Sequence, residues 1–152
     1  MGKHKDKSVW WESRRNATIQ LLSQAYLNNS PEKSVRIRIV DNEGFLTIKG
    51  PSYDGGLSRF EWEKNIPISE AKELMKLCGD QQILKKRYFV KYNNIILEVD
   101  EFLNNNNGLV LAEVELKTTS QKIVLPDWIA EEVTGVNKYY NLSLSTNPFS
   151  SW

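Results

Sequence analysis

Charged residues of one sign recur at alternate positions in several stretches of this chain. Five such pairs are Arg36/Arg38, Glu61/Glu63, Lys85/Arg87, Glu98/Asp100 and Glu113/Glu115. Lys49 is a single basic residue in a similar alternating stretch. Successive side chains of an extended strand point to opposite faces, so the two members of each pair share a face. The pattern predicts strands that each present two like charges side by side.

Two like charges side by side indicate a ligand of opposite charge. On a water-facing sheet the signs would be expected to mix, because neighbouring like charges cost energy. Arginine and lysine donate charge-assisted hydrogen bonds to phosphate oxygens, and carboxylates are hard ligands for Mg²⁺ or Mn²⁺. The pairs together predict a metal–polyphosphate site. Side chains would bind the anion, because Asp54-Gly55-Gly56 lacks the spacing and the lysine of a phosphate-binding loop.

Alternation of charged and apolar residues defines the strands that would carry these pairs. In Ser34–Gly50, Ile37 and Ile39 lie on the face opposite Arg36 and Arg38, and Asn42-Glu43-Gly44 turns the chain back. The remaining predicted strands are 18–27, 58–66, 83–92, 95–102 and 109–117.

Two helices are predicted. Pro67–Gly79 has an apolar face, Ser69 as a candidate N-cap and Gly79 at the C′ position. Pro126–Val133 is predicted as a short helix with proline in its first turn. Residues 1–7 are polar and without periodicity, and we expect them to form a disordered tail.

The length predicts one domain over residues 1–152, and the many predicted strands with few helices indicate a mainly β (α+β) fold. Twenty Lys and Arg against nineteen Asp and Glu give no overall polarity that would recruit nucleic acid or a membrane. The single cysteine, Cys78, cannot form an internal disulfide, and no N-terminal apolar run resembles a signal peptide or a membrane span. A cytoplasmic protein is expected. Cys78 is interpreted as a small buried residue, because the only histidine, His4, lies in the tail.

The residues alone leave two arrangements open. In one, the strands close into a barrel whose charged face lines the interior and whose apolar face is covered by helices. In the other, the sheet stays open with its charged face in water.

Seven ordered segments resemble CYTH-domain proteins of the triphosphate tunnel metalloenzyme superfamily, in particular the short bacterial branch. The resemblance runs from about Gln24 to Asn141. The segments are VRIRI, FLTIKG, GLSRFEWE, ILKKRYFV, LEVDEF, LAEVEL and PDWIAEEVTGVNKYYN. It implies an eight-stranded antiparallel β-barrel with flanking helices, whose tunnel binds a triphosphate and the divalent cation Mg²⁺ or Mn²⁺.

The resemblance also implies roles for individual residues. Basic residues would line the tunnel and bind phosphates: Arg36, Arg38, Lys49, Lys85 and Arg87. Carboxylates would bind the metal: Asp100, Glu113 and Glu115. Glu61 and Glu63 match acidic positions that hold or activate the attacking water, while Glu98 has either an outward, supporting role or a catalytic one.

The N-terminus departs from the family pattern. Family members open with a strand reading E-x-E-x-K, and this chain has MGKHKDKSVWWE instead, in which His4 and Asp6 imitate the glutamate spacing poorly. Two explanations stay open: the first strand is missing through truncation or a misassigned start, or the chain is a diverged member with weakened or lost hydrolysis. A missing strand would leave a sheet edge that a second copy of the chain could cover, as in a homodimer.

Two functions follow from the resemblance. The first is metal-dependent hydrolysis of inorganic triphosphate or, less favoured, of a nucleoside triphosphate. The alternative is a protein that binds polyphosphate or nucleotide without cleaving it. Adenylate cyclase activity is the third choice, because no feature of the sequence indicates adenine recognition.

Overall fold

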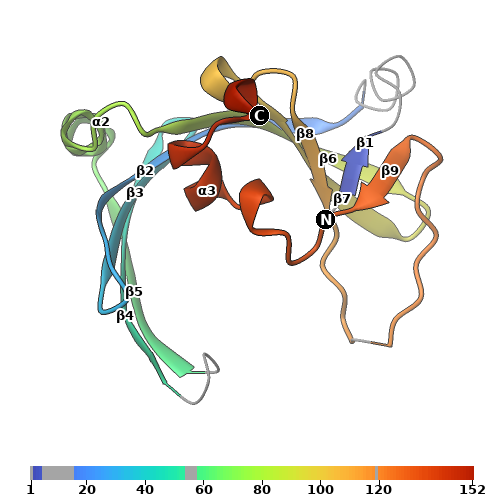
Figure 1. Ribbon diagram of the computed structural model, residues 1–152, viewed down its shortest axis with the longest axis horizontal. Helices are drawn as coiled ribbons and strands as arrows, with labels where there is room; N and C mark the ends of the chain where they lie inside the picture. Colours follow the sequence, from blue (N-terminus) through green and yellow to red (C-terminus); the bar gives the residue numbers. More distant parts are fainter. Residues whose placement is uncertain (1, 5–15, 54–57, 119) are drawn as a thin grey trace. The chain divides into compact units, whose positions relative to one another are not determined.

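The computed structural model describes residues 2–4, 16–53, 58–118 and 120–152. Its strands are joined by antiparallel pairing and accompanied by few helices, which confirms the predicted mainly β fold (Figure 1). The chain forms two compact units. Leu21–Leu84 is called the α2 unit, and Met1–Gln20 together with Lys85–Trp152 is called the α3 unit.

Four antiparallel strands and one helix make up the α2 unit. The strands are β2 (Thr18–Asn29), β3 (Ser34–Val40), β4 (Glu43–Tyr53) and β5 (Ser58–Ile66), in the order β5-β4-β3-β2. The helix is α2 (Ile68–Leu77). The predicted hairpin is present, because β3 and β4 pair from Ser34↔Lys49 to Val40↔Glu43.

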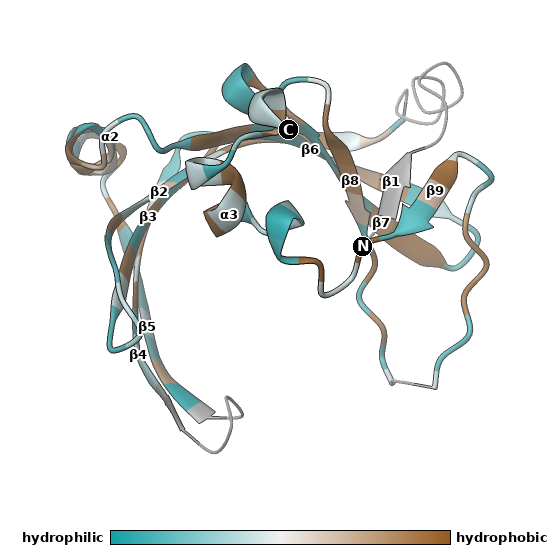
Figure 2. Ribbon diagram, in the orientation of Figure 1, coloured by the Kyte–Doolittle hydropathy of each residue, from teal (hydrophilic) through white to brown (hydrophobic). Residues whose placement is uncertain are grey.

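Helix α2 covers the apolar face of this sheet. Ile37 and Ala25 are buried against Ala71 and Met75 of the helix. Gly44 permits this close approach, since an added Cβ would lie 2.5 Å from the Cβ of Ala71. Along these strands, hydrophobic and hydrophilic residues alternate in the colouring of Figure 2.

The described strands of the α3 unit follow the order β6-β7-β8-β1-β9. They are β6 (Ile83–Tyr92), β7 (Ile95–Phe102), β8 (Val110–Glu113), β1 (Gly2–His4) and β9 (Ile129–Glu132). The short helix α3 (Asn141–Thr146) lies near the end of the chain, and three 3₁₀ turns cover 104–106, 137–139 and 149–151. Seven residues form the core of the unit: Tyr88, Val90, Leu97, Val99, Val110, Ala112 and Trp128.

Several local predictions differ from the structure. The predicted helix at 126–133 is wrong, because Pro126 begins a turn closed by the amide of Ile129, and Ile129–Glu132 then pair with β1 as strand β9. Gly2–His4 form strand β1, which pairs with β8 and β9 where a disordered tail was expected. Helix α2 begins at Ile68, so Pro67 and not Ser69 occupies its N-cap position.

The predicted end of helix α2 is confirmed. Gly79 follows α2 with φ +73°, the left-handed conformation expected at the C′ position. The described part of the chain contains nine strands. Two of them, β1 and β9, were not predicted as strands. No helix of the described residues is long and apolar enough to cross a membrane.

Candidate functional site

Five of the predicted site residues lie on one face of the α2 unit, opposite α2. The strand register aligns Arg36 with Thr47 of β4, and Thr47 with Glu63 of β5. It also aligns Lys49 with Glu61. Arg38 shares this face, because it is two residues from Arg36 on the same strand. We call this surface the charged face of the α2 unit.

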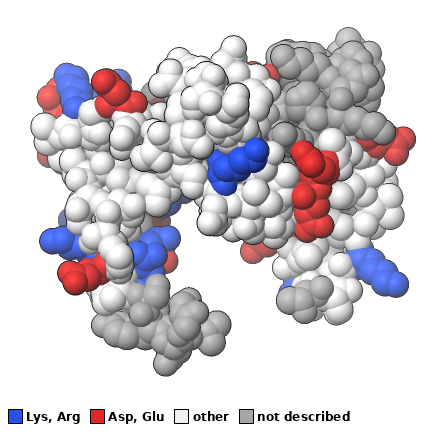
Figure 3. Space-filling model, viewed as in Figure 1, with Lys and Arg blue, Asp and Glu red and all other residues white. Residues whose placement is uncertain are grey.

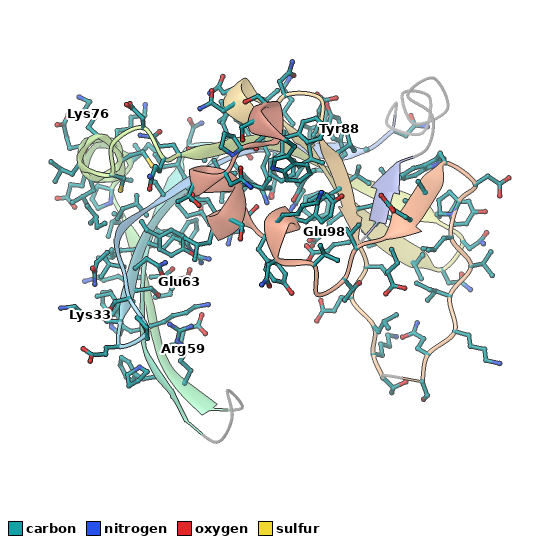
Figure 4. All side chains as sticks on the ribbon, viewed as in Figure 1. Lys33, Arg59, Glu63, Lys76, Tyr88 and Glu98 are labelled. Atoms are coloured by element: carbon teal, nitrogen blue, oxygen red, sulfur yellow. The ribbon has the colours of Figure 1, made fainter. Side chains whose placement is uncertain are left out.

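A buried threonine links the two signs of charge on this face. The Thr47 hydroxyl donates to Glu63 Oε1 at 2.8 Å and accepts from Arg36 Nη2 at 3.4 Å. Arg36 Nη2 also lies 3.9 Å from Glu63 Oε1. Glu63, labelled in Figure 4, extends from β5. Thr47 was not predicted as a site residue. It is two residues from Lys49 on the same strand, and that spacing placed it on the charged face.

Arg36 retains unused hydrogen-bonding capacity. Its Nε is buried and has no hydrogen-bond partner among the described residues. Buried donors are nearly always satisfied in folded proteins, so an orphan donor in a charged side chain requires an explanation such as a missing ligand. An anion on the charged face would supply that partner.

The α3 unit contains a second cluster, centred on a buried aspartate. Asp100 accepts from Arg87 through both oxygens, Nε to Oδ1 at 2.8 Å and Nη2 to Oδ2 at 3.0 Å. Lys85 Nζ lies 2.8 Å from Asp100 Oδ2. The side chains of Lys85 and Asp100 are 5% and 8% exposed, so this triad is largely removed from water.

Burial and pairing shift the pKa values of this triad in opposing ways. Burial, the largest effect, lowers the pKa of Lys85 below its ordinary value despite the attraction of Asp100. Burial alone would raise the pKa of Asp100, but the hydrogen bonds from Arg87 and the charge of Lys85 outweigh it and leave that pKa lowered. Asp100 is therefore held as a carboxylate that fixes two cations.

Lys85 has further neighbours from the C-terminal segment and from β7. Its Nζ donates to Asn141 Oδ1 at 3.2 Å and lies 5.3 Å from the ring centroid of Phe102. Lys85, Arg87, Asp100 and Asn141 line a pocket of about 150 Å³. Asn141 was not predicted as a site residue, although it ends the last of the quoted family segments.

The remaining carboxylates lie along β7 and β8. Glu98 and Glu113 are aligned across the two strands, and Glu98, labelled in Figure 4, lies 3.2 Å from Arg87 Nη1. Glu115 follows the end of β8 at Glu113, earlier than the predicted strand end at residue 117. All three glutamates line a second pocket of about 670 Å³.

The predicted residues are thus brought together within each unit. The α2 unit holds Arg36, Arg38, Lys49, Glu61 and Glu63 on one face. In the α3 unit, Lys85, Arg87, Glu98, Asp100 and Glu113 share a face by strand register. The described residues contain no group of three His, Cys, Asp or Glu side chains able to hold a metal by themselves.

Opposite charges face each other across two strand pairs, although Glu98 and Glu113 are aligned like charges. Lys49 is aligned with Glu61, and Arg87 with Asp100, and Figure 3 shows basic next to acidic side chains within the α2 unit. The repulsion expected along each strand is thereby offset without a ligand. Charge alternation alone is therefore weaker evidence for a bound anion than the orphan nitrogen of Arg36.

The fold and these charged faces fit one class of protein. The chain matches the model of the CYTH domain over residues 14–146 and belongs to the CYTH family. The matched range is wider than the resemblance recognised over 24–141.

Individual relatives carry a more specific name. The chain is 43% identical over 133 residues to the inorganic triphosphatase of Acetivibrio thermocellus, covering 87% of this chain and 84% of that one. It is 32% identical over 128 residues to the inorganic triphosphatase of Nitrosomonas europaea, covering 82% and 83%. The crystal structure of the inorganic triphosphatase NE1496 matches with a TM-score of 0.72 at 28% identity, covering 86% and 87%.

Proposed function

We propose that this protein hydrolyses inorganic triphosphate with the help of Mg²⁺ or Mn²⁺. The proposal is supported by 43% identity to a relative named inorganic triphosphatase. Within the structure, the observation that carries it is the buried Nε of Arg36, which has no hydrogen-bond partner in the described part of the chain and lies on a face shared with Arg38 and Lys49. A face built this way suits a ligand with many anionic oxygens.

The basic residues would bind the phosphates and fix their orientation. Arg36 and Arg38 offer planar guanidinium groups that suit two phosphate oxygens at once, while Lys49 offers a point charge. Lys85 and Arg87 would contribute in the same way from β6. Asp100 was predicted to be a metal ligand. Its two oxygens already accept hydrogen bonds from Lys85 and Arg87, so we propose instead that it holds these two cations in place.

Glu113 and Glu115 fit a divalent cation. Within the part of the chain that the structure describes, neither glutamate has an ion-pair partner, and both line a pocket with Glu98. Mg²⁺ typically binds through one or two carboxylates together with substrate phosphates, so a three-residue cage is not required. When bound, Mg²⁺ or Mn²⁺ would neutralise charge on the phosphate oxygens.

Glu61 and Glu63 would bind and activate the attacking water. The hydroxyl of Thr47 fixes one oxygen of Glu63, which leaves the other to accept a hydrogen from water. The carboxylate would orient the water oxygen in line with the bond between the terminal phosphorus and the leaving diphosphate. It would take a proton from the water as the new P–O bond forms. The bond from the terminal phosphorus to the bridging oxygen breaks, and phosphate and diphosphate are released.

A second candidate is binding of triphosphate without cleavage. Strand β1 reads GKH and carries no glutamate, whereas the strand that opens other family members carries two. Loss of these carboxylates would remove metal ligands and leave the basic residues in place. Triphosphate would then bind in a metal-linked, salt-sensitive way and remain intact.

Phosphate release and calorimetry together distinguish the candidates. The enzyme should release phosphate from triphosphate with Mg²⁺ or Mn²⁺, and Glu115→Ala should lower kcat/KM at least about a hundredfold by weakening the metal site. Glu70→Ala on the exposed side of α2 is the matched control and should leave the rate unchanged. Binding heat without release from triphosphate or a nucleoside triphosphate would favour the second candidate, and neither heat nor release would reject both.

A further inference from the structure

The segment Asn137–Asn141 belongs to the family resemblance but has no part in the proposed reaction. Its last residue, Asn141, begins α3 and is half-buried. Its side-chain oxygen accepts a hydrogen bond from Lys85 of β6, 56 residues earlier in the chain. A polar contact between elements so far apart in sequence fixes the ammonium group relative to the C-terminal segment.

We propose that Asn141 is a positioning residue that directs the Lys85 ammonium group toward the phosphates of the substrate. This inference rests on the proposed function, since it assigns Lys85 to phosphate binding. Asn141 itself would not contact the reacting atoms. It would act by accepting one of the three N–H groups of Lys85.

Among the described residues, the hydrogen bonds of Lys85 leave one donor for a ligand. An ammonium group has three N–H donors and no acceptor. Asp100 Oδ2 at 2.8 Å and Asn141 Oδ1 at 3.2 Å account for two of them. The Phe102 ring lies beside the ammonium group, and Lys85 also lines the small pocket, where its third donor could meet a ligand.

An amide suits this position better than a second carboxylate would. Asp100 already supplies one negative charge to Lys85 and Arg87. Another carboxylate at position 141 would neutralise the cation pair further and repel a phosphate. The amide oxygen of Asn141 instead offers a hydrogen bond without net charge, so it orients Lys85 and preserves its attraction for an anion.

Four residues on three strands lie around the Lys85 ammonium group besides Asn141. They are Arg87 on β6, Asp100 and Phe102 on β7, and Glu113 on β8. Each belongs to a strand, whereas Asn141 comes from the C-terminal segment. The position of α3 would therefore be coupled to the direction of a phosphate-binding lysine.

A double-mutant cycle on triphosphate binding tests this inference. Dissociation constants would be measured calorimetrically for inorganic triphosphate in the presence of a chelator, so that no turnover occurs. We expect Asn141→Leu to weaken binding about three- to tenfold, which is less than the effect of losing a direct hydrogen bond to a charged group because Asn141 acts through Lys85. In a Lys85→Met background, Asn141→Leu should have no further effect, because its target is gone.

Two controls separate positioning from a general structural effect. Asn137→Leu makes the same change at an exposed residue of the same segment and should leave binding unchanged. Asn141→Ala repeats the cycle with a smaller side chain, in case leucine prevents folding. Equal losses from Asn141→Leu with and without Lys85→Met would overturn the positioning role, while phosphate release by the natural chain with Mg²⁺ or Mn²⁺ would still uphold the proposed function. Failure of the natural chain to bind triphosphate, both with the chelator and with Mg²⁺ or Mn²⁺ in its place, would overturn both.

Discussion

Arg36 combines a hydrogen bond to Thr47 with a second donor that is buried and partnerless within the described residues. A lysine in its place would keep the charge and lose the planar fork. The distinction between these two side chains is therefore a direct test of whether a multidentate anion binds on the charged face of the α2 unit.

Arg36→Lys should weaken triphosphate binding about tenfold, because a hydrogen bond to a charged group is lost while the net charge is kept. Calorimetric titration would measure the change. Lys72→Ala on the exposed surface of α2 removes a whole charge elsewhere and should change the dissociation constant less than twofold. Equal affinities for the natural chain and Arg36→Lys would contradict fork-shaped binding by Arg36.

Asp100 is the residue whose removal should affect stability most clearly. Asp100→Asn keeps the shape but leaves Lys85 and Arg87 close together and largely buried without their shared anion. Removing one partner of a buried ion pair costs about 3 kcal/mol of the free energy of unfolding. Urea unfolding at neutral pH would measure this, and a loss below about 0.5 kcal/mol would be inconsistent with the buried triad.

At the scale of elements, the contact between α2 and the sheet depends on one glycine. Gly44 lies where an added Cβ would approach the Cβ of Ala71 to 2.5 Å and the carbonyl oxygen of Ile66 to 3.1 Å. Neither neighbour is the end of a flexible side chain. A methyl group there would therefore force the helix away from β4.

Gly44→Ala should destabilise the protein by about 1 to 3 kcal/mol, the usual cost of overpacking a core. Thermal and urea unfolding would measure the loss. Ala71→Gly removes the opposing methyl group, so the loss in the double variant should be smaller than the sum of the two single losses. Additive losses would mean that the two positions do not meet.

The strands of the α2 unit could be predicted from sequence because apolar and charged residues alternate regularly there. Ile37 and Ile39, for example, alternate with Arg36 and Arg38. The end of the chain was less predictable. Residues 126–133 contain proline near the start and good helix formers, yet Ile129–Glu132 pair with β1. That pairing depends on a partner more than 120 residues away, which no local pattern reports.

The candidate site was predictable in its charged members and not in its uncharged ones. Arg36, Lys49 and Glu63 were assigned to sheet faces from the alternation of side chains along each strand. The strand register places all three on one face. Thr47 and Asn141 carry no charge, so nothing in the alternation distinguished them from ordinary strand and loop residues. Their roles depend on contacts with residues 16 and 56 positions away.

At the scale of the whole molecule, the buried carboxylate predicts how stability depends on pH. The pKa of Asp100 is lower in the folded chain than in the unfolded chain. Its contribution is therefore fully present above the unfolded pKa of about 3.9 and is lost as pH falls through the folded value.

The free energy of unfolding of the natural chain should accordingly fall on acidification below about pH 4, in part through Asp100. Asp100→Asn should be less stable at neutral pH, and its difference from the natural chain should shrink as pH decreases. Unfolding curves at a series of pH values would show this convergence. A constant difference across the acid range would contradict the lowered pKa.

The account as a whole depends on Arg38 and its neighbours acting on a triphosphate. The most direct measurement is the rate of phosphate release from inorganic triphosphate with Mg²⁺ or Mn²⁺, for the natural chain, Arg38→Ala and Lys64→Ala in parallel. Lys64 lies on β5 but on the opposite face, aligned with Leu46. We predict release by the natural chain and by Lys64→Ala, with a loss of about a hundredfold or more in Arg38→Ala. Equal rates in all three proteins would contradict the account.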